Sequence, residues 1–479
     1  MEPIKTELVV LGAGPGGYTA AFYAADRGKK VTLVEQNPRL GGVCLNVGCI
    51  PSKALLHATQ LIREAKESAT RGIEFGGPTI DLDKLRSWKE DILEKLGQGI
   101  KGLAQKRGVT LIQGRGHFED SQTLRVETTE GQKFISYDQA IIAVGSKPAM
   151  PSAFDLGNKR IMTSTEALEI QDVPNDLLIV GGGYIGMELG TVYAALGSNV
   201  VVLEALPSIL MGVDADLVRP VLRVAQKAFK EIRVNTKVLK MATAGKQIKV
   251  TMELNNEQRE ELYDRVLVSV GRSPNYGDLG LQNTKVEKDD KGFIKCNPQQ
   301  QTDDPNIYAI GDVNGGALLA HRASKEARIV VEAILGEASA FDNFVIPAVV
   351  YTDPEVAWCG LTETDAKARE IDVKVAKILW GASGRALTLD RLDGLTKLII
   401  EPETERILGV GIVGVGAGDL ISEGVLAVEM GATARDLAET VHPHPTLSET
   451  LMEAAEAFYG TATHTLSTRR DSARGSTES

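Results

Sequence analysis

The sequence predicts an α/β fold with two dinucleotide-binding, Rossmann-like units. Two glycine-rich motifs carry this prediction, GAGPGG at residues 12–17 and GGGYIG at residues 181–186. A third observation ties them together, because Glu35 and Glu204 each follow the first glycine of their motif by 23 residues, at the end of a short apolar run. Two copies with the same internal spacing indicate a repeated structural unit.

The first copy has the full order of a βαβ unit. Its parts are a strand at residues 6–11, glycines Gly12, Gly14 and Gly17, an alanine-rich helix to about Arg27, a strand at residues 30–34, and Glu35. The glycines permit a tight turn and close approach of a pyrophosphate, and the acid suits ribose hydroxyls. A GxGxxG motif alone is weak evidence, but this order makes it specific.

The second copy repeats this order after a strand at residues 177–180. A shift of 169 residues superimposes four further pairs: Gly14 on Gly183, Gly17 on Gly186, Gly28 on Gly197, and Val31 on Val200. The acid Glu204 is followed by no basic residue until Arg219. An acid here favours the free 2′-hydroxyl of NAD over the phosphate of NADP.

The segment GGVCLNVGCIPSK, residues 41–53, places Cys44 and Cys49 at the expected start of a helix, with Pro51 in its first turn. The positive end of a helix dipole lowers the pKa of a nearby thiol, and Cys49 is the better placed of the two. Redox chemistry is therefore the favoured interpretation. The alternatives are a pair of buried free cysteines, or a zinc site with only His57 nearby as a further ligand.

Several later segments have less specific patterns. Leu85, Trp88, Ile92 and Leu96 recur at helical spacing and are expected to be core residues. Strands are expected at 110–113, 124–128 and 139–144, before Gly145 and the prolines at 148 and 151 that mark the crossing into the second unit. A strand at 307–310 delivers Asp312 to a polar cofactor group or, alternatively, to a turn.

From about residue 345, strands at 348–351, 373–379, 398–401 and 407–413 alternate with helices and lack a phosphate loop, which indicates a packing or interface role. HPHPTLSE follows, at residues 442–449. If Pro445 starts a helix, Glu449 can orient His444 and raise its basicity. A satisfied structural histidine is the alternative. The His444–Pro445 bond is a candidate for cis geometry.

Composition excludes some classes of function. The chain has 479 residues and a net charge of −11, which argues against a nucleic-acid surface. It has no apolar run of the roughly 18 residues that a membrane helix needs. The N-terminus leads directly into a strand, so no signal peptide is expected. We expect a cytoplasmic or equivalent reducing compartment.

Together, GGVCLNVGCIPSK, GGGYIGMELG, AIGDV and HPTLSE resemble the pyridine nucleotide-disulphide oxidoreductase family over about residues 4–462. The resemblance implies FAD and NAD domains, a central domain, and a C-terminal α+β dimerisation domain. The implied boundaries are 1–147 (FAD), 148–275 (NAD), 276–345 (central, returning to the FAD domain), 346–466 (interface) and 467–479 (a disordered tail). It further implies a homodimer that reoxidises dihydrolipoamide on a lipoylated acyltransferase or glycine cleavage carrier protein.

The resemblance also implies residue roles. Cys49 would lie against the flavin, Cys44 would exchange with the substrate, and His444 of the partner subunit would be the base, held by Glu449. Lys53 would sit beside the flavin and pair with Glu188. The resemblance implies no metal. The implied FAD and NAD contacts are Gly12, Gly14, Gly17, Glu35, Gly42, Lys53, Gly116, Gly145, Asp312, Ala320, Gly181, Gly183, Gly186, Glu204, Val238 and Gly271.

Some positions depart from the family pattern. Pro443 separates the two histidines, and Ser324 stands where the family usually has glutamate; we expect no effect of Ser324 on chemistry. Cys296 and Cys359 are expected to be structural. Two alternative functions remain: reduction of another small disulphide, and a scaffold role with a vestigial redox site.

Overall fold

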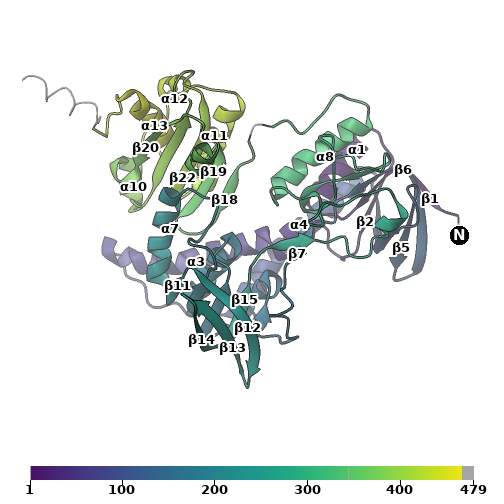
Figure 1. The fold of residues 1–479 in the computed structure, drawn as a ribbon, viewed down its shortest axis with the longest axis horizontal. Helices are drawn as coiled ribbons and strands as arrows, with labels where there is room; N and C mark the ends of the chain where they lie inside the picture. Colours follow the sequence, from purple (N-terminus) through teal and green to yellow (C-terminus); the bar gives the residue numbers. More distant parts are fainter. Residues whose placement is uncertain (1, 344, 467–479) are drawn as a thin grey trace, which may run out of the picture. The chain divides into compact units, whose positions relative to one another are not determined.

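The computed structural model describes residues 2–343 and 345–466, and the predicted disordered tail lies outside these residues. The chain forms two compact units. Unit 1 comprises Met1–Val173 and Val268–Asp342, and unit 2 comprises Pro174–Leu267 and Asn343–Ser479. The finer division into four domains stays a prediction. Each unit is an α/β structure, which confirms the predicted fold class (Figure 1).

Unit 1 is built on a seven-stranded sheet. Its strands are β1 (Ile4–Leu11), β2 (Val31–Glu35), β3 (Thr110–Gln113), β4 (Arg115–Phe118), β5 (Thr123–Thr128), β6 (Gly131–Ile142) and β17 (Ile307–Ala309). The long strand β6 pairs antiparallel with β5 along its first half and parallel with β17 along its last three residues. The chain therefore returns to the first sheet after the second nucleotide motif.

Hydrophobic residues bury both faces of this sheet. In β1, Leu8 and Val10 face one core, with helices α1 (Pro15–Asp26) and α8 (Ala320–Ile334), whereas Val9 and Leu11 face the other. This follows from the two-residue period of a strand. A parallel sheet covered on both faces gives the near-continuous apolar runs seen in the sequence. Helices α1 and α8 lie side by side (Figure 1).

The cysteine segment forms two helices rather than one. Helix α2 (Gly42–Val47) contains Cys44, and α3 (Cys49–Glu67) begins at Cys49 itself. Pro51 lies in the first turn of α3, as predicted, and Gly48 has a non-helical backbone between the two helices. Only Cys49 therefore lies at the N-terminus of the long helix.

Helix α4 (Leu82–Lys106) corrects the predicted core stripe. Trp88 and Leu96 are 40% and 42% exposed, whereas Lys89, Leu93 and Gly97 face inward. The prediction followed the largest apolar residues. The buried stripe instead includes a lysine whose ammonium donates to the Leu168 carbonyl at 2.9 Å, and a glycine that packs against Arg39.

Two short strands of unit 1 lie before and after the segment 174–267 of unit 2 in the sequence. Strand β7 (Ser146–Pro148) pairs antiparallel with β16 (Arg272–Pro274). Strand β8 (Ile161–Met162) and helix α5 (Ser164–Ala167) follow β7, before the chain enters unit 2 at Pro174.

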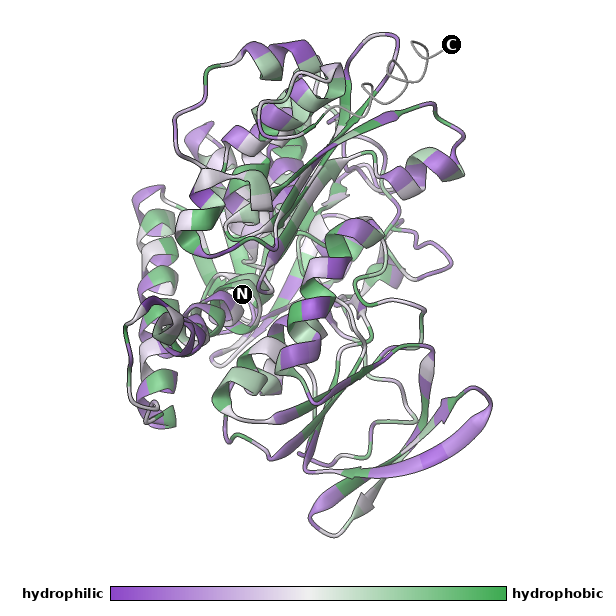
Figure 2. Cartoon of the chain, turned by 90° about the vertical axis from the view of Figure 1, so that its left-hand side faces the viewer, coloured by the Kyte–Doolittle hydropathy of each residue, from purple (hydrophilic) through white to green (hydrophobic). Residues whose placement is uncertain are grey.

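Unit 2 contains the second nucleotide-binding motif. Strands β11 (Glu231–Arg233), β10 (Asn199–Leu203), β9 (Asp176–Val180) and β15 (Arg265–Val268) are neighbours in that order. Helices α6 (Tyr184–Leu196) and α7 (Ala215–Ala228) accompany them. An antiparallel meander of β12 (Thr236–Ala244), β13 (Gln247–Leu254) and β14 (Glu257–Tyr263) follows. Hydrophobic residues lie on both strands and helices, and the helices carry hydrophobic and hydrophilic residues side by side (Figure 2).

The C-terminal part of unit 2 is an antiparallel sheet in the order β18-β19-β22-β21-β20. Its strands are β18 (Ala348–Val350), β19 (Glu355–Gly360), β20 (Lys374–Leu379), β21 (Leu395–Ile400) and β22 (Ile407–Gly414). Its helices are α9 (Glu363–Ala368), α10 (Gly384–Leu389), α11 (Ala417–Glu429), α12 (Ala434–Glu439) and α13 (Glu449–Tyr459). Strand β19 was not predicted. It contains the buried Cys359, which confirms the structural interpretation of that thiol.

A buried lysine joins the start of α7 to this sheet. Lys397 on β21 is 1% exposed, and its ammonium donates to Asp214, Asp216 and Glu363 at 2.6, 2.8 and 2.8 Å. Burial raises the pKa of Asp214, but hydrogen bonds led by that of Lys397 outweigh burial and hold it below its usual range. The three carboxylates are close enough to hold a metal ion, and the lysine ammonium supplies the cation.

Replacement of Lys397 is expected to destabilise unit 2 strongly. Lys397→Met would leave three carboxylates together without their buried cation, at a cost of about 3 kcal/mol. The matched control is Lys377→Met, because Lys377 pairs with Asp216 and Glu363 but is 37% exposed, so its loss should cost about 1 kcal/mol or less. Thermal unfolding of both variants checks the difference, and equal small shifts would contradict it.

Among the described residues, no helix is long and apolar enough to cross a membrane.

Candidate redox and nucleotide-binding site

The two glycine-rich motifs place open helix N-termini at the ends of β1 and β9. Helices α1 and α6 begin after Gly14 and Gly183, and neither has a side-chain cap or an acid in its first turn. The threonine-capped helices α9 and α12 differ in this respect. Uncapped N–H groups at a helix N-terminus form an anion site, so both helices fit the pyrophosphate of a dinucleotide.

Close backbone contacts explain two of the predicted glycines. A Cβ on Gly17 would lie 1.8 Å from the Gly12 carbonyl oxygen, so only glycine lets α1 pack against the turn. A Cβ on Gly42, which has a φ of +59°, would lie 2.5 Å from Gly14 Cα. The start of the cysteine segment therefore packs directly on the first nucleotide loop.

The acids Glu35 and Glu204 make equivalent hydrogen bonds in the two copies. One Glu35 oxygen accepts from the N–H of Ala13 and the other from Asn37, both at 2.8 Å. Glu204 accepts from Gly182 at 2.7 Å and Leu206 at 2.8 Å. These partners are related by the same shift of 169 residues, which confirms the internal repeat. Each carboxylate is thus fixed by its own loop, with lone pairs left for a ribose.

The redox cysteines lie together in unit 1. The Cys44 and Cys49 thiols are hydrogen-bonded to each other, and this bond, followed by burial, raises the pKa of Cys44, while Lys53 acts in the opposite direction. These effects favour the protonated form of the Cys44 thiol. Tyr18 on α1 also lies close, since the two cysteines contribute to its raised pKa after burial. No sequence signal had marked Tyr18.

Asp312 lies in a 3-10 turn (Gly311–Asn314) directly after β17. Its carboxylate accepts a short hydrogen bond from the Ser146 hydroxyl, and Arg272 Nε donates to the same hydroxyl at 2.6 Å. Residues of the paired strands β7 and β16 thus fix the position of the Asp312 carboxylate. Sequence reasoning missed Ser146 and Arg272, whose only signal was their position after Gly145 and Gly271.

A buried network supports the Asp312 turn from α8. Glu326 is fully buried and accepts from the N–H of Gly311 at 2.7 Å. Arg322 pairs with Glu326 at 2.6 Å and donates to Asn314 at 3.0 Å. Burial is the main cause of the raised pKa of Glu326. Ser324, the departure from the family pattern, donates to the Ala320 carbonyl within the same helix.

The predicted histidine–glutamate contact is present in unit 2. His444 Nδ1 lies 2.8 Å from Glu449 Oε1, and the other oxygen of Glu449 accepts from the Thr446 N–H at 2.7 Å. Burial acts to raise the pKa of Glu449, but these two hydrogen bonds outweigh it and the pKa is lowered. The imidazole is 75% exposed, which disfavours a satisfied structural histidine. Helix α13 starts at Glu449 rather than at Pro445, and the His444–Pro445 bond is cis as predicted.

The remaining predicted residues are spread over both units. Glu188 is buried in α6 and accepts from the Tyr351 N–H at 2.9 Å. Lys53 lies in α3 of unit 1, so its pairing with Glu188 stays a prediction. Gly116 packs against Leu11 and Leu124, which supports a packing role. The other positions are Ala320 at the first turn of α8, Val238 in β12, Gly186 in α6, and Gly145 and Gly271 beside β7 and β16.

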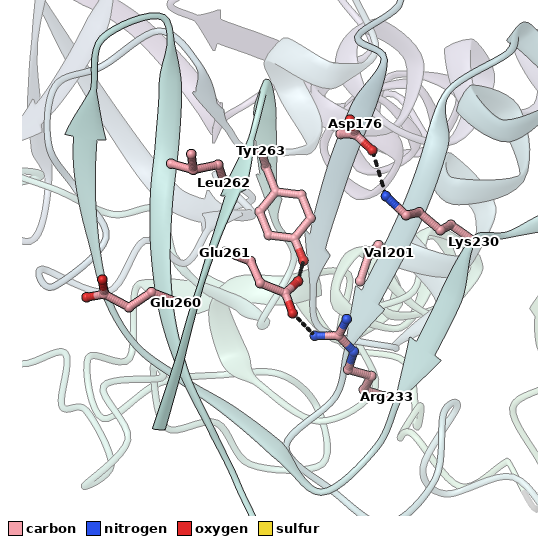
Figure 3. Close-up of a pocket in the computed structure, with 8 residues that line it drawn as sticks. All are labelled: Asp176, Val201, Lys230, Arg233, Glu260, Glu261, Leu262 and Tyr263. Carbon is pink, nitrogen blue, oxygen red and sulfur yellow. Dashed lines mark hydrogen bonds and ion pairs between the residues drawn. The ribbon is translucent and has the colours of Figure 1, made fainter. Parts of the chain in front are cut away.

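A cavity of about 370 Å³ in unit 2 is lined by residues between Asp176 and Tyr263. Four of its charged side chains are paired with one another, Lys230 with Asp176 at 3.0 Å and Arg233 with Glu261 at 2.7 Å (Figure 3), and the fifth, Glu260, pairs with Lys249 at 3.0 Å. Tyr263 donates to Glu261 at 2.5 Å. This pairing leaves the cavity without a charge directed at a ligand.

These sites define a flavin- and pyridine-nucleotide-dependent redox protein, and the comparisons with known proteins agree. Residues 6–327 match the pyridine nucleotide-disulphide oxidoreductase family, and residues 346–455 match its dimerisation domain. The chain belongs to this family, and it is an oxidoreductase whose cofactors are FAD and NAD.

Similar proteins share nearly the whole chain. Dihydrolipoyl dehydrogenases of Vibrio cholerae and Haemophilus influenzae are 45% and 46% identical over 463 residues, covering 96% of this chain and 97% of each relative. Among solved structures, LpdA from Mycobacterium tuberculosis is 25% identical with a TM-score of 0.88, covering 95% of this chain and 99% of that one. The flavoprotein disulfide reductase RclA from Escherichia coli is 26% identical with a TM-score of 0.83, covering 93% and 98%.

Proposed function

We propose that this chain reoxidises protein-bound dihydrolipoamide to lipoamide and passes the electrons to NAD. The full-length similarity to dihydrolipoyl dehydrogenases carries the choice of substrate. The hydrogen-bonded pair of Cys44 and Cys49, next to the first nucleotide loop, supports the chemistry. When bound, FAD supplies the hydride chemistry that connects a dithiol to a pyridine nucleotide.

The proposed reaction starts from the Cys44–Cys49 disulphide. One substrate thiol loses its proton to His444, and its thiolate attacks Cys44 Sγ, which breaks the Cys44–Cys49 bond and leaves Cys49 as a thiolate. The sulfur of the second substrate thiol then attacks the substrate sulfur bonded to Cys44 while its proton passes to the departing Cys44 sulfur, so that cyclic lipoamide leaves and Cys44 becomes a thiol. The substrate dithiol thus loses two electrons, and the Cys44–Cys49 disulphide gains them.

The geometry of His444 suits the role of base. Because Nδ1 donates to the lowered-pKa carboxylate of Glu449, the neutral ring has its lone pair on Nε2, where a thiol proton can be accepted. The raised pKa of Cys44 agrees with its role as the thiol that takes a proton when product leaves.

The cofactors would be held by the two nucleotide-binding loops. FAD would use Gly12, Gly14 and Glu35 of unit 1 together with Asp312, and NAD would use Gly183 and Glu204 of unit 2. Both uncapped helices and both fixed acids fit a dinucleotide. The remaining predicted contacts and the pairing of Lys53 with Glu188 are part of the same proposal.

The match to a dimerisation domain supports a homodimer in which the partner subunit's His444 completes each site. Lipoylated acyltransferases and the glycine cleavage carrier protein are the proposed partners, in the cytoplasm or an equivalent reducing compartment.

One assay tests the reaction. Purified protein should be yellow and should reduce NAD with dihydrolipoamide, while glutathione disulphide with a reduced pyridine nucleotide should give little turnover. A colourless protein that binds no flavin would contradict the proposal. Strong preference for glutathione disulphide would instead identify a reductase for another small disulphide.

Cofactor preference is expected to depend on Glu204. Replacing Glu204 and Ala205 by arginine should move the ratio of kcat/KM values toward NADP by about 10- to 100-fold, because a carboxylate repels a 2′-phosphate and arginine binds it. Glu204→Gln is the matched control, since it keeps an acceptor for the Gly182 N–H and removes only the charge. Unchanged preference in the arginine variant would contradict the assignment.

A further inference from the structure

The two histidines of HPHPTLSE have opposite surroundings. The His442 side chain is 4% exposed, and both of its ring nitrogens are bonded. Nε2 lies 2.7 Å from Glu423 Oε1, and Nδ1 lies 2.8 Å from the Thr440 carbonyl oxygen. His444, two residues later, is 75% exposed and contacts Glu449 through Nδ1. The satisfied histidine of this motif is therefore His442.

The partners of His442 determine its protons. A carbonyl oxygen and a carboxylate oxygen both accept hydrogen bonds, whereas a neutral imidazole has a single N–H. Both contacts can be hydrogen bonds at the same time only when both ring nitrogens carry a proton.

His442 ties the loop at residues 440–448 to its surroundings at one end. Glu423 belongs to α11, and Thr440 ends α12, so the ring joins two helices at the point where the loop begins. At the other end, Glu449 holds the Thr446 N–H, and the Thr446 hydroxyl donates to the Pro443 carbonyl at 2.7 Å. His444 lies between these two fixed points.

The charge of His442 affects the neighbouring pair of His444 and Glu449. The charged groups bonded to the two histidines are Glu423 from α11 and Glu449 from α13, and α12, which Thr440 caps at its C-terminus, carries Arg435, Asp436 and Glu439. His442 is among the causes that lower the pKa of Glu449, after burial and the hydrogen bonds from Thr446 and His444. A cation here also opposes the addition of a second positive charge on His444.

We propose that His442 is a positioning residue: held by Glu423 as an imidazolium, it fixes the loop that carries His444 and favours the neutral, proton-accepting form of His444. In this proposal His442 positions the loop, and His444 accepts the substrate proton. This inference rests on the proposed function, in which His444 is the base.

The first test is the pH dependence of the holoenzyme. In His442→Gln, kcat/KM for dihydrolipoamide should fall by about 10-fold. The acidic limb of the plot of kcat/KM against pH should also move to higher pH by on the order of half a unit, because Glu423 without its cation favours protonated His444. Arg435→Gln is the control, because it removes a cation from an exposed pair with Glu439 and should leave the profile unchanged. A uniform loss at every pH would overturn the proposal.

The second test observes the ring directly. Holoenzyme with 15N-labelled histidine should show one ring with both nitrogens protonated at about pH 8, and this signal should be absent in His442→Gln. Glu423→Gln, which keeps an acceptor without its charge, should move the titration of that ring to lower pH. A neutral His442 ring would overturn the proposal even if a variant folds poorly.

The two hypotheses fail differently. If the proposed function is wrong, the wild-type protein will not oxidise dihydrolipoamide, whereas the labelled ring can still be observed. If only the role of His442 is wrong, the wild-type protein will be active and the acidic limb of His442→Gln will not move.

Discussion

Cys44→Ser is expected to abolish dihydrolipoamide-dependent reduction of NAD, with a loss of about 10³-fold or more. A serine hydroxyl cannot form the Cys44–Cys49 disulphide or the mixed disulphide, so the substrate thiolate has no disulphide to attack. The variant should keep its FAD, because the contact of Gly42 with the first nucleotide loop is made by the backbone and does not involve this side chain. Turnover and flavin content of the purified protein check both expectations.

Cys49→Ser is the matched comparison. It should be equally inactive with dihydrolipoamide, but it lacks the thiolate that is proposed to lie against the flavin. Long-wavelength flavin absorption at neutral pH should therefore appear in Cys44→Ser and be missing from Cys49→Ser. Unchanged turnover of Cys44→Ser would support the alternative of a scaffold with a vestigial site.

His444→Gln is expected to lower kcat/KM for dihydrolipoamide by about 10²- to 10⁴-fold, the usual contribution of a general base. Glutamine retains a polar group for Glu449 but cannot take up the thiol proton. In the wild-type protein the rate should fall at acidic pH, since a protonated imidazole is no longer a base. The variant should lose this acidic limb.

The matched control for His444 is Glu449→Gln, which should cost less because the imidazole remains and only its orientation and charge partner change. Reduction of ferricyanide by NADH, which bypasses the thiol exchange, should be retained in both variants. Equal loss of the ferricyanide activity would show that the substitution damages the fold rather than proton transfer.

The nucleotide-binding part of the site could be predicted because its signals are local. Gly12, Gly17 and Glu35 form contacts within one βαβ unit, so their spacing along the chain reflects their geometry. The same holds for His444 and Glu449, which are five residues apart and lie in contact.

The missed features depend on partners distant in sequence. Arg272 contacts Ser146, 126 residues away, and His442 contacts Glu423 on another helix. The inward position of Lys89 on α4 depends on the Leu168 carbonyl, which no periodicity of apolar residues can reveal. The separate helix α2 was not predicted, because its separation from α3 depends on the backbone of one residue, Gly48.

The pairing of β7 with β16 has a consequence for how such a chain can be divided. Residues 174–267 belong to unit 2 and stand between these two paired strands in the sequence, so they interrupt unit 1 as an inserted domain does. Unit 1 is nevertheless not an N-terminal fragment, because β17 completes its sheet beside β6 and Asp312 follows immediately. Translation must therefore pass the second nucleotide-binding motif before the first can be finished.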